Sequence, residues 1–154
     1  MTTQVVLRAV EPADIEVFYE HQADPAAAAM AAFPARDRAA HFDHWNKRVL
    51  GNPVGIVRTV VVDGAVAGNI VSWIDPELGR LLGYWIGREF WGRGIATEAV
   101  RLYLSEVRDR PLHAFVAANN VGSRRVLEKS GFAPTSDEPH VGTDGVAEIL
   151  YRLG

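Results

Sequence analysis

The stretch GYWIGREFWGRGIATEAV (Gly83–Val100) indicates a strand, a tight turn that contains glycine, and a helix that opens directly on that turn. Gly92 and Gly94 flank Arg93, so the backbone can bend sharply and leave several N–H groups pointing outward. A helix that begins at Ile95 has first amides without partners inside the helix, at the positive end of its dipole. The pattern therefore predicts an anion site, most simply for a phosphate or pyrophosphate, and the Arg93 guanidinium suits phosphate oxygens.

Size and composition indicate one globular domain. The chain has 154 residues, with 48% hydrophobic and 23% charged residues, which is enough for a buried core over residues 1–154. The formal net charge of -3 argues against a dedicated nucleic-acid partner. No apolar run approaches the roughly 20 residues that cross a bilayer, and the N-terminal segment does not resemble a signal peptide. We therefore expect a cytoplasmic protein with no membrane partner.

The chain contains no cysteine, and this limits its chemistry. Disulfides, thiolate metal sites and a covalent acyl-cysteine intermediate are excluded. Any group that the protein transfers must move without a cysteine relay.

Hydrophobic periodicity and turn residues predict an α/β fold of the α+β type, with helices packed on a mixed, mostly antiparallel, twisted sheet. The sheet should have about six or seven strands, accompanied by about four helices. The segment Asp24–Ala35 is either a short helix with loops or a mobile flap. The expected strands cover residues 5–9, 56–62, 65–74, 80–86, 112–116, 132–135 and 146–153, and the expected helices cover residues 12–22, 37–50, 95–109 and 121–130.

Two other phosphate-binding patterns compete for the glycine turn. A dinucleotide fold needs three glycine-type positions near the start of a βαβ repeat and an acid roughly 20 residues later. Here the turn follows antiparallel-looking strands, and the next acid of note, Asp109, ends a helix. A nucleoside-triphosphate loop needs Lys-Ser or Lys-Thr after the glycines, where this chain has Ile95 and Ala96. A structural turn without a ligand is the remaining alternative.

Two motifs resemble the GNAT acyltransferase superfamily, and more narrowly its branch that acts on ribosomal-protein N-termini and related amines. WGRGIATEA (Trp91–Ala99) resembles the pyrophosphate loop and the helix after it. NVGSRRVLEKSGF (Asn120–Phe132) resembles the second signature, which has an Asn, a Ser three residues later and a closing Lys-x-Gly-Phe. The order of elements also fits, so the resemblance implies a single GNAT-like acetyltransferase domain over nearly the whole chain.

The resemblance also implies how acetyl-CoA is bound. Backbone amides of the turn would hold the pyrophosphate, the strand end at Ile86 and Gly87 would pair with the pantetheine arm like an added strand, and Asn120 would bond that arm. Ser123 would lie near the sulfur as candidate proton donor. Arg88, Arg124 and Arg125 could meet the outer phosphate, although Arg124 and Arg125 could instead form a solvated helix face. The implied cofactor-binding residues are Ile86, Gly87, Arg88, Gly92, Arg93, Gly94, Ile95, Ala96 and Asn120, with Ser123 as the catalytic residue and no metal.

Two positions depart from the family pattern. The loop begins with Glu89 where Gln or Arg is common, and Leu81 stands where many relatives carry an acid. One common candidate for the general base is therefore missing. The other candidate bases are Glu148, which is otherwise an edge-strand surface acid, and His140, which is otherwise an exposed loop histidine.

The acceptor site is expected to form from the variable segments Asp24–Leu50 and Ser136–Gly145. His41 and His44 are three residues apart on an expected helix, so they suggest either a weak metal pair or part of the acceptor entrance. Phe33 is a candidate acceptor wall and Trp45 is a candidate core residue. Strand alternation does not decide which way Trp73 faces.

We therefore expect an N-acetyltransferase that moves the acetyl group of acetyl-CoA to a primary amine by direct attack in a ternary complex. The acceptor is a small-molecule amine or a protein N-terminus, and a homodimer is left open. The alternative is a catalytically inactive acyl-CoA-binding sensor. A nucleic-acid contact through Arg124, Arg125 and Lys129 is disfavoured.

Overall fold

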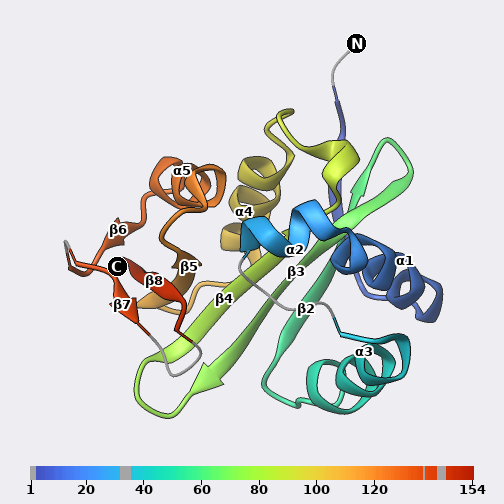
Figure 1. Ribbon diagram of the computed structural model, residues 1–154, viewed down its shortest axis with the longest axis horizontal. Helices are drawn as coiled ribbons and strands as arrows, with labels where there is room; N and C mark the ends of the chain where they lie inside the picture. The colour runs from blue at the N-terminus through green and yellow to red at the C-terminus, as the bar shows by residue number, and fades with distance from the viewer. Residues whose placement is uncertain (1–2, 32–35, 137, 142–144) are drawn as a thin grey trace.

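The computed structural model describes residues 3–31, 36–136, 138–141 and 145–154, and within these ranges it is a mixed α/β fold (Figure 1). The strands are β1 (Val5–Arg8), β2 (Ile56–Val62), β3 (Ala65–Asp75), β4 (Gly79–Ile86), β5 (Leu112–Ala117), β6 (Ala133–Pro134), β7 (His140–Val141) and β8 (Ala147–Leu153). The α-helices are α1 (Pro12–Ala23), α2 (Pro25–Ala31), α3 (Arg38–His44), α4 (Ile95–Glu106) and α5 (Val121–Lys129).

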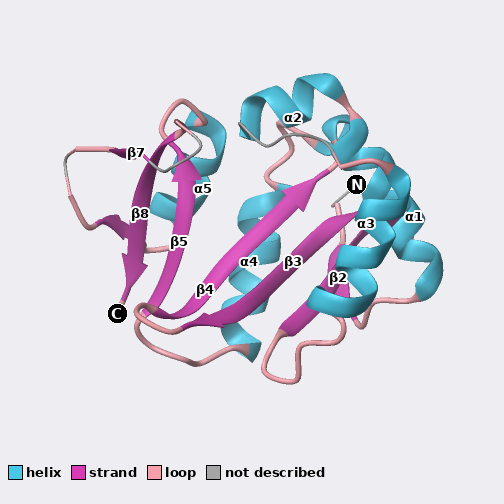
Figure 2. Ribbon diagram, turned by 60° about the horizontal axis from the view of Figure 1, so that its bottom comes forward, coloured by secondary structure: helices cyan, strands magenta, loops and turns pink. Residues whose placement is uncertain are grey.

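All the strands belong to one sheet, in the order β1-β2-β3-β4-β5-β8-β6, with β7 also paired to β8. Every pairing is antiparallel except that of β4 with β5, which is parallel and is matched at the single residue pair Leu81 and His113. Figure 2 shows β4 and β5 diverging from this point, so the sheet opens between them. The predicted mixed, mostly antiparallel sheet is confirmed.

The described residues contain more elements than expected, with eight strands and five α-helices. The additional strand β7 has two residues, too few for an alternating pattern to be visible in the sequence. The additional helix α2 lies in the Asp24–Ala35 segment, for which a short helix was one of two expectations. The last strand was expected at an edge, but β8 lies between β5 and the short β6 and β7.

Two helix ends also differ from the prediction. The expected helix over residues 37–50 is α3 followed by a π-helical turn over Trp45–Val49. The helix expected to reach Asp109 ends at Glu106, because Val107 takes an extended conformation and buries its side chain in the core.

Helices cover both faces of the sheet, and a hydrophobic core lies under each cover. On one face α4 contributes Ile95, Val100 and Tyr103 to the larger core. On the other face Ile15 and Phe18 of α1 pack with Trp45, whose ring centroid lies 4.8 Å from that of Phe18. The prediction that Trp45 is a core residue is confirmed, and its helix is thereby fixed on this second face.

A buried carboxylate joins the first helix to two strands. Asp14 accepts hydrogen bonds from Arg8 of β1 (2.6 and 3.0 Å) and from the Thr59 hydroxyl of β2 (2.8 Å). It also accepts from the Glu11 backbone N–H (2.8 Å) at the start of α1. Burial opposes ionisation of Asp14, but the bonds from Arg8, Glu11 and Thr59 outweigh it and hold its pKa below the usual range.

We predict that Asp14→Asn lowers the free energy of unfolding by about 2–4 kcal/mol at pH 7, because it leaves a buried network without its charge. The pKa of Asp14 is lowered by folding, so its contribution is complete above the unfolded value of about 3.9 and is lost as the pH falls through the folded value. Urea denaturation should therefore show that the difference in free energy of unfolding between the wild-type protein and Asp14→Asn becomes smaller at acid pH.

The control is Glu16→Gln on the same helix, which removes an exposed ion pair with Arg38 and should lower the free energy of unfolding far less than Asp14→Asn does. Equal losses in the two variants at pH 7, or a gap for Asp14→Asn that does not change with pH, would contradict this account of the network.

Candidate functional site

The glycine turn has the conformation that the sequence predicts. A short 3-10 turn over Arg88–Phe90 follows β4, and then Gly92 and Gly94 adopt φ values of 74° and 73°, in the left-handed region that favours glycine. A Cβ added at either glycine would meet no atom within 4 Å, so open space lies in front of this turn. Glycine is required here by the backbone conformation rather than by crowding.

The turn leads directly into the amino end of α4. The Gly94 carbonyl accepts the first helical hydrogen bond from the Glu98 N–H at 3.1 Å, so the amides of residues 95–97 lie ahead of the hydrogen-bonded part of the helix. Gly94 is the N-cap and has no side chain to bond them. The helix dipole adds positive potential at the same place, which makes the turn a suitable anion site.

Strand β4 directs part of its backbone into the gap beside it. The Gly87 N–H donates to the Ala67 carbonyl at 2.8 Å, so the polar groups of Gly87 face β3. Because these groups alternate along a strand, those of Ile86 and Tyr84 face the opposite way, toward the opening between β4 and β5. The Ile86 carbonyl already accepts a hydrogen bond from the Trp91 indole Nε1–H at 2.9 Å. An extended ligand in the gap would therefore find the Ile86 carbonyl already hydrogen-bonded.

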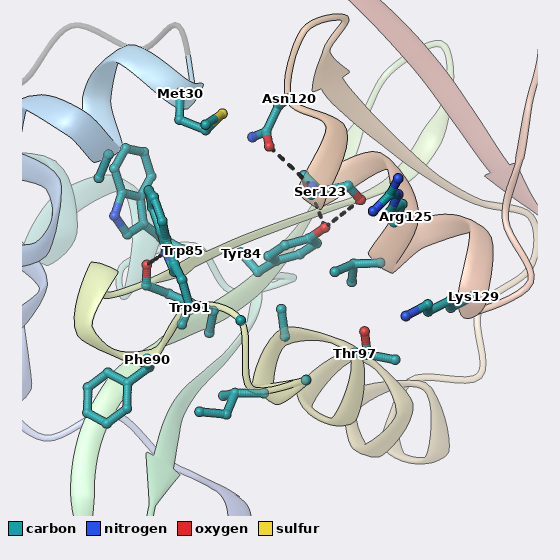
Figure 3. Close-up of a pocket in the computed structure, with 18 residues that line it drawn as sticks. Met30, Tyr84, Trp85, Phe90, Trp91, Thr97, Asn120, Ser123, Arg125 and Lys129 are labelled. Carbon is teal, nitrogen blue, oxygen red and sulfur yellow. Dashed lines mark hydrogen bonds between the residues drawn. The ribbon is translucent and has the colours of Figure 1, made fainter.

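A cavity of about 470 Å³ fills this opening (Figure 3). Its walls come from α2, the end of β4, the glycine turn with the start of α4, and α5. The lining residues are Ala27, Met30, Tyr84, Trp85, Ile86, Phe90, Trp91, Gly92, Gly94, Ile95, Ala96, Thr97, Asn120, Gly122, Ser123, Arg125, Val126 and Lys129. The cavity thus joins the two motifs, which are far apart in the sequence.

A tyrosine and a serine meet inside this cavity. The Tyr84 hydroxyl lies 2.6 Å from Ser123 Oγ and donates to the Ser123 carbonyl at 3.2 Å (Figure 3). Burial raises the pKa of Tyr84 to about 12, although the bond to Ser123 acts in the opposite direction. The phenol is therefore protonated at neutral pH. The sequence motif singled out Ser123 but not Tyr84, whose position on the same strand face as Ile86 was the available signal.

The amino end of α5 arranges the second motif. Asn120 caps the helix, its side-chain oxygen accepting from the Ser123 N–H at 3.2 Å. Arg124 points away from the cavity, because it donates to the Tyr151 hydroxyl and to the Ala118 carbonyl, both at 3.2 Å. Arg124 is half-buried and does not line the cavity, and whether it meets the outer phosphate stays a prediction. Arg125 and Lys129, one helical turn apart, do line the cavity.

Most of the predicted cofactor residues come together around this cavity. Those that line it are Ile86, Gly92, Gly94, Ile95, Ala96 and Asn120, together with Ser123. Arg88 instead forms an ion pair with Asp24 at 3.2 Å, and Arg93 lies over the Phe90 ring at 5.8 Å. Gly87 packs against His21, whose Nε2 would be 2.6 Å from a Cβ at that position.

A second cavity, of about 580 Å³, lies on the face of the sheet that α1 and α3 cover. Its lining residues are Phe18, Gln22, Arg36, His41, His44, Trp45, Arg48, Val49, Asn52, Val57, Asn69, Val71, Ser72, Trp73, Gly83, Tyr84 and Trp85. Tyr84 and Trp85 line both cavities, so the two meet across β4. The expected acceptor segment Asp24–Leu50 contributes to this cavity, whereas the described part of Ser136–Gly145 does not. Phe33 lies outside the described residues.

The two histidines of the second cavity have different surroundings. His41 is buried and donates from Nε2 to the Ile15 carbonyl at 3.1 Å, which gives it a structural role. His44 is half-buried, and burial lowers its pKa, so the imidazole is neutral at pH 7. Among the described residues, no group of three His, Cys, Asp or Glu side chains is placed to hold a metal ion. Glu148 and His140 line neither of the two cavities.

A glycine turn at a helix start, beside two strands that separate, is a candidate site for a cofactor with a diphosphate group and an extended arm. The chain belongs to the GNAT acetyltransferase family, since the family described as "Acetyltransferase (GNAT) domain" matches residues 4–133. It is also similar to the "Probable N-acetyltransferase YjcK" of Bacillus subtilis (strain 168), with 44% identity over 55 residues. That match spans 33% of this chain and 30% of the relative.

Solved structures share the whole fold. One is the spermidine N-acetyltransferase from Vibrio cholerae in complex with CoA and spermine, with a TM-score of 0.80 at 14% identity, covering 97% of this chain and 95% of that one. Another is the GNAT-family acetyltransferase from Bacillus anthracis, with a TM-score of 0.78 at 19% identity, covering 97% and 93%. At these identities the similarity shows the fold. Among the helices of the described ranges, none has the length and apolar character to span a bilayer.

We predict that Gly94→Val raises the Kd for CoA at least about 30-fold, because a β-branched residue at φ 73° is strained and displaces the amides that follow. Gly64→Val is a matched control, since Gly64 also has a positive φ (86°) and open space for a Cβ but lies in the β2–β3 hairpin. Both variants should lose similar stability, roughly 1–2 kcal/mol. Equal affinities for CoA in the two variants, measured by calorimetry, would refute the role of the turn.

Proposed function

We propose that this protein transfers the acetyl group of acetyl-CoA to a primary amine, by direct attack in a ternary complex. The observation that carries this proposal is the meeting of two cavities at Tyr84 and Trp85. One cavity has the anion site and the open strand edge that suit the cofactor, and the other has aromatic and polar walls that suit a small acceptor. Both substrates can therefore reach the same point of β4 from opposite sides.

The first cavity supports a specific orientation of the cofactor. The diphosphate would bond the amides of residues 92–96 at the start of α4, and the pantetheine amides would lie along the Tyr84 and Ile86 edge. The Ile86 carbonyl already accepts a hydrogen bond from the Trp91 indole. At Ile86 the pantetheine arm would therefore bond the backbone N–H. Arg125 and Lys129 line the cavity from α5, where cationic groups favour a further phosphate.

The acceptor amine must be neutral when it attacks the thioester. At neutral pH a lysine-type amine, with a pKa of about 10.4, costs roughly 4–5 kcal/mol to deprotonate, whereas an α-amine near 7.7–8.0 costs only about 1 kcal/mol. His44 lines the acceptor cavity as a neutral imidazole and is our candidate to receive this proton, directly or through water. The thioester carbonyl would be polarised by a backbone amide near Ile86.

The leaving thiolate is stabilised by the Tyr84–Ser123 pair. A thiol has a pKa of about 8.5, whereas that of Tyr84 is about 12, so complete proton transfer from the phenol would be uphill by roughly 5 kcal/mol. The pair therefore acts mainly by donating a hydrogen bond to the thiolate, and the Ser123 hydroxyl is the group that delivers it. The proton that ends on the thiol can come from solvent once the product amide has formed.

The alternative function is an acyl-CoA-binding sensor without catalysis. The observation that favours it is the absence of carboxylates from both cavity linings among the described residues, together with the buried Leu81 at the position of a common base. A sensor would bind acetyl-CoA and release no thiol with any amine. A protein N-terminus as acceptor, a homodimer and a cytoplasmic location stay predictions.

We predict that Tyr84→Phe and Ser123→Ala each lower kcat by about 10- to 100-fold, while KM for acetyl-CoA changes less than about threefold. The physical reason is that each change removes a hydrogen bond that is needed only as the thiolate forms. Release of CoA can be followed with a colorimetric thiol reagent, because the protein has no cysteine to add background.

Tyr103→Phe is the control for these variants. Tyr103 is also a buried tyrosine whose pKa is raised to about 12 by burial, but it bonds Ile56 and Ser72 and does not line either cavity. It should lower stability and leave kcat unchanged. If Tyr84→Phe and Ser123→Ala keep the wild-type rate, the pair has no part in the reaction.

A further inference from the structure

We propose that the second cavity selects an acceptor whose amine adjoins an anionic group and carries an aromatic or large apolar body, as in an aromatic α-amino acid. The same lining would exclude polycationic amines. This inference rests on the proposed function, because it concerns the acceptor for the same acetyl transfer. It is carried by the charge of the cavity lining and by the shape of its aromatic walls.

The ionisable groups of the second cavity are basic, apart from the Tyr84 phenol. Arg36, Arg48, His41 and His44 line it, and no aspartate or glutamate does so among the described residues. A polyamine would bring two or more positive charges into this lining without a carboxylate to pair them, whereas a carboxylate on the acceptor would complement the arginines.

Arg36 and Arg48 reach the cavity in different ways. Arg36 is held through its backbone, since its N–H donates to Gln22 Oε1 at 3.0 Å and its carbonyl accepts from Gln22 Nε2 at 3.1 Å. Gln22 is itself buried on α1. The chain is therefore pinned where Arg36 reaches the cavity.

Arg48 differs from its neighbour in the π-helical turn. Lys47 forms an ion pair with Asp43 at 2.7 Å and does not line the cavity. Arg48 lines the cavity and forms no ion pair with the described residues. One basic residue of this turn is thus neutralised within the protein, and the other is left to meet a ligand.

The groups around His44 also create a positive electrostatic potential in this cavity. Burial lowers its pKa most, and the positive charges of Arg36, His41 and Arg48 lower it further. Among the described residues, no acidic group raises the pKa of His44. A cationic part of an acceptor would meet the same positive potential, and an anionic part would be attracted by it.

Aromatic rings provide the rest of the wall. Phe18, Trp45, Trp73 and Trp85 line the cavity, and Trp73 rests on Gly83, where a Cβ would lie 3.2 Å from its ring. Trp73 is 39% exposed, so part of its indole surface remains open to a ligand. Such walls favour a flat or apolar body, and a cavity of this size holds one amino acid of that kind easily.

The test compares matched acceptors with the intact protein and acetyl-CoA. Phenylalanine and tryptophan differ from their amides in the carboxylate, and spermidine supplies a polycation. Expressed per neutral amine, kcat/KM should be at least about tenfold higher for each amino acid than for its amide, and lowest for spermidine. A preference for the amides or for spermidine would overturn this inference and leave the proposed function intact.

Two variants locate the effect. Arg48→Gln should lower kcat/KM for phenylalanine about five- to twentyfold and change that for phenylalaninamide less than twofold. Lys47→Gln, the same charge change one residue away, should leave both values unaltered. An equal loss for acid and amide, or an equal effect of the two variants, would contradict the role of Arg48. Acetyl-CoA binding without thiol release for any acceptor would count against the proposed function itself.

Discussion

The separation of β4 from β5 is the constraint on which the site depends. Each strand is fully paired on its outer side, β4 with β3 over eight residue pairs and β5 with β8 over six. Between them the pairing stops after Leu81 and His113. The sheet therefore has an internal edge whose polar groups need a partner, and the amides of an extended cofactor arm can supply one. The stable outer ladders allow this opening to exist without loss of the fold.

The other parts of the site follow from this opening. The chain that leaves β4 turns at Gly92 and Gly94 and starts α4 at the wide end of the gap, so the anion site lies beside the open edge. Helix α5 follows β5 across the gap and brings Ser123 to Tyr84. The second cavity reaches the same strand from the opposite face. One irregularity in strand pairing thus brings the glycine turn, the Tyr84–Ser123 pair and the two cavities together.

Local sequence patterns predicted the parts of this arrangement that depend on neighbouring residues. Positive φ at Gly92 and Gly94 follows from the predicted turn itself, and the helix that follows Asn120 begins at Val121, where the sequence predicts it. Arg124 and Arg125 could not be separated in this way, because Arg124 bonds Tyr151 and Ala118, which lie on other elements, whereas Arg125 lines the cavity. The acceptor cavity likewise needs Gln22, Arg48 and Trp73, which come from three distant elements and share no sequence signature.

The most direct test of the account is a crystal structure of the protein with CoA bound. We expect diphosphate oxygens at about 3 Å from the backbone nitrogens of residues 92–96, with the pantetheine arm running between β4 and β5. A diphosphate bound elsewhere, or those nitrogens bonded instead to protein carbonyls, would contradict the central claim that the glycine turn holds the cofactor.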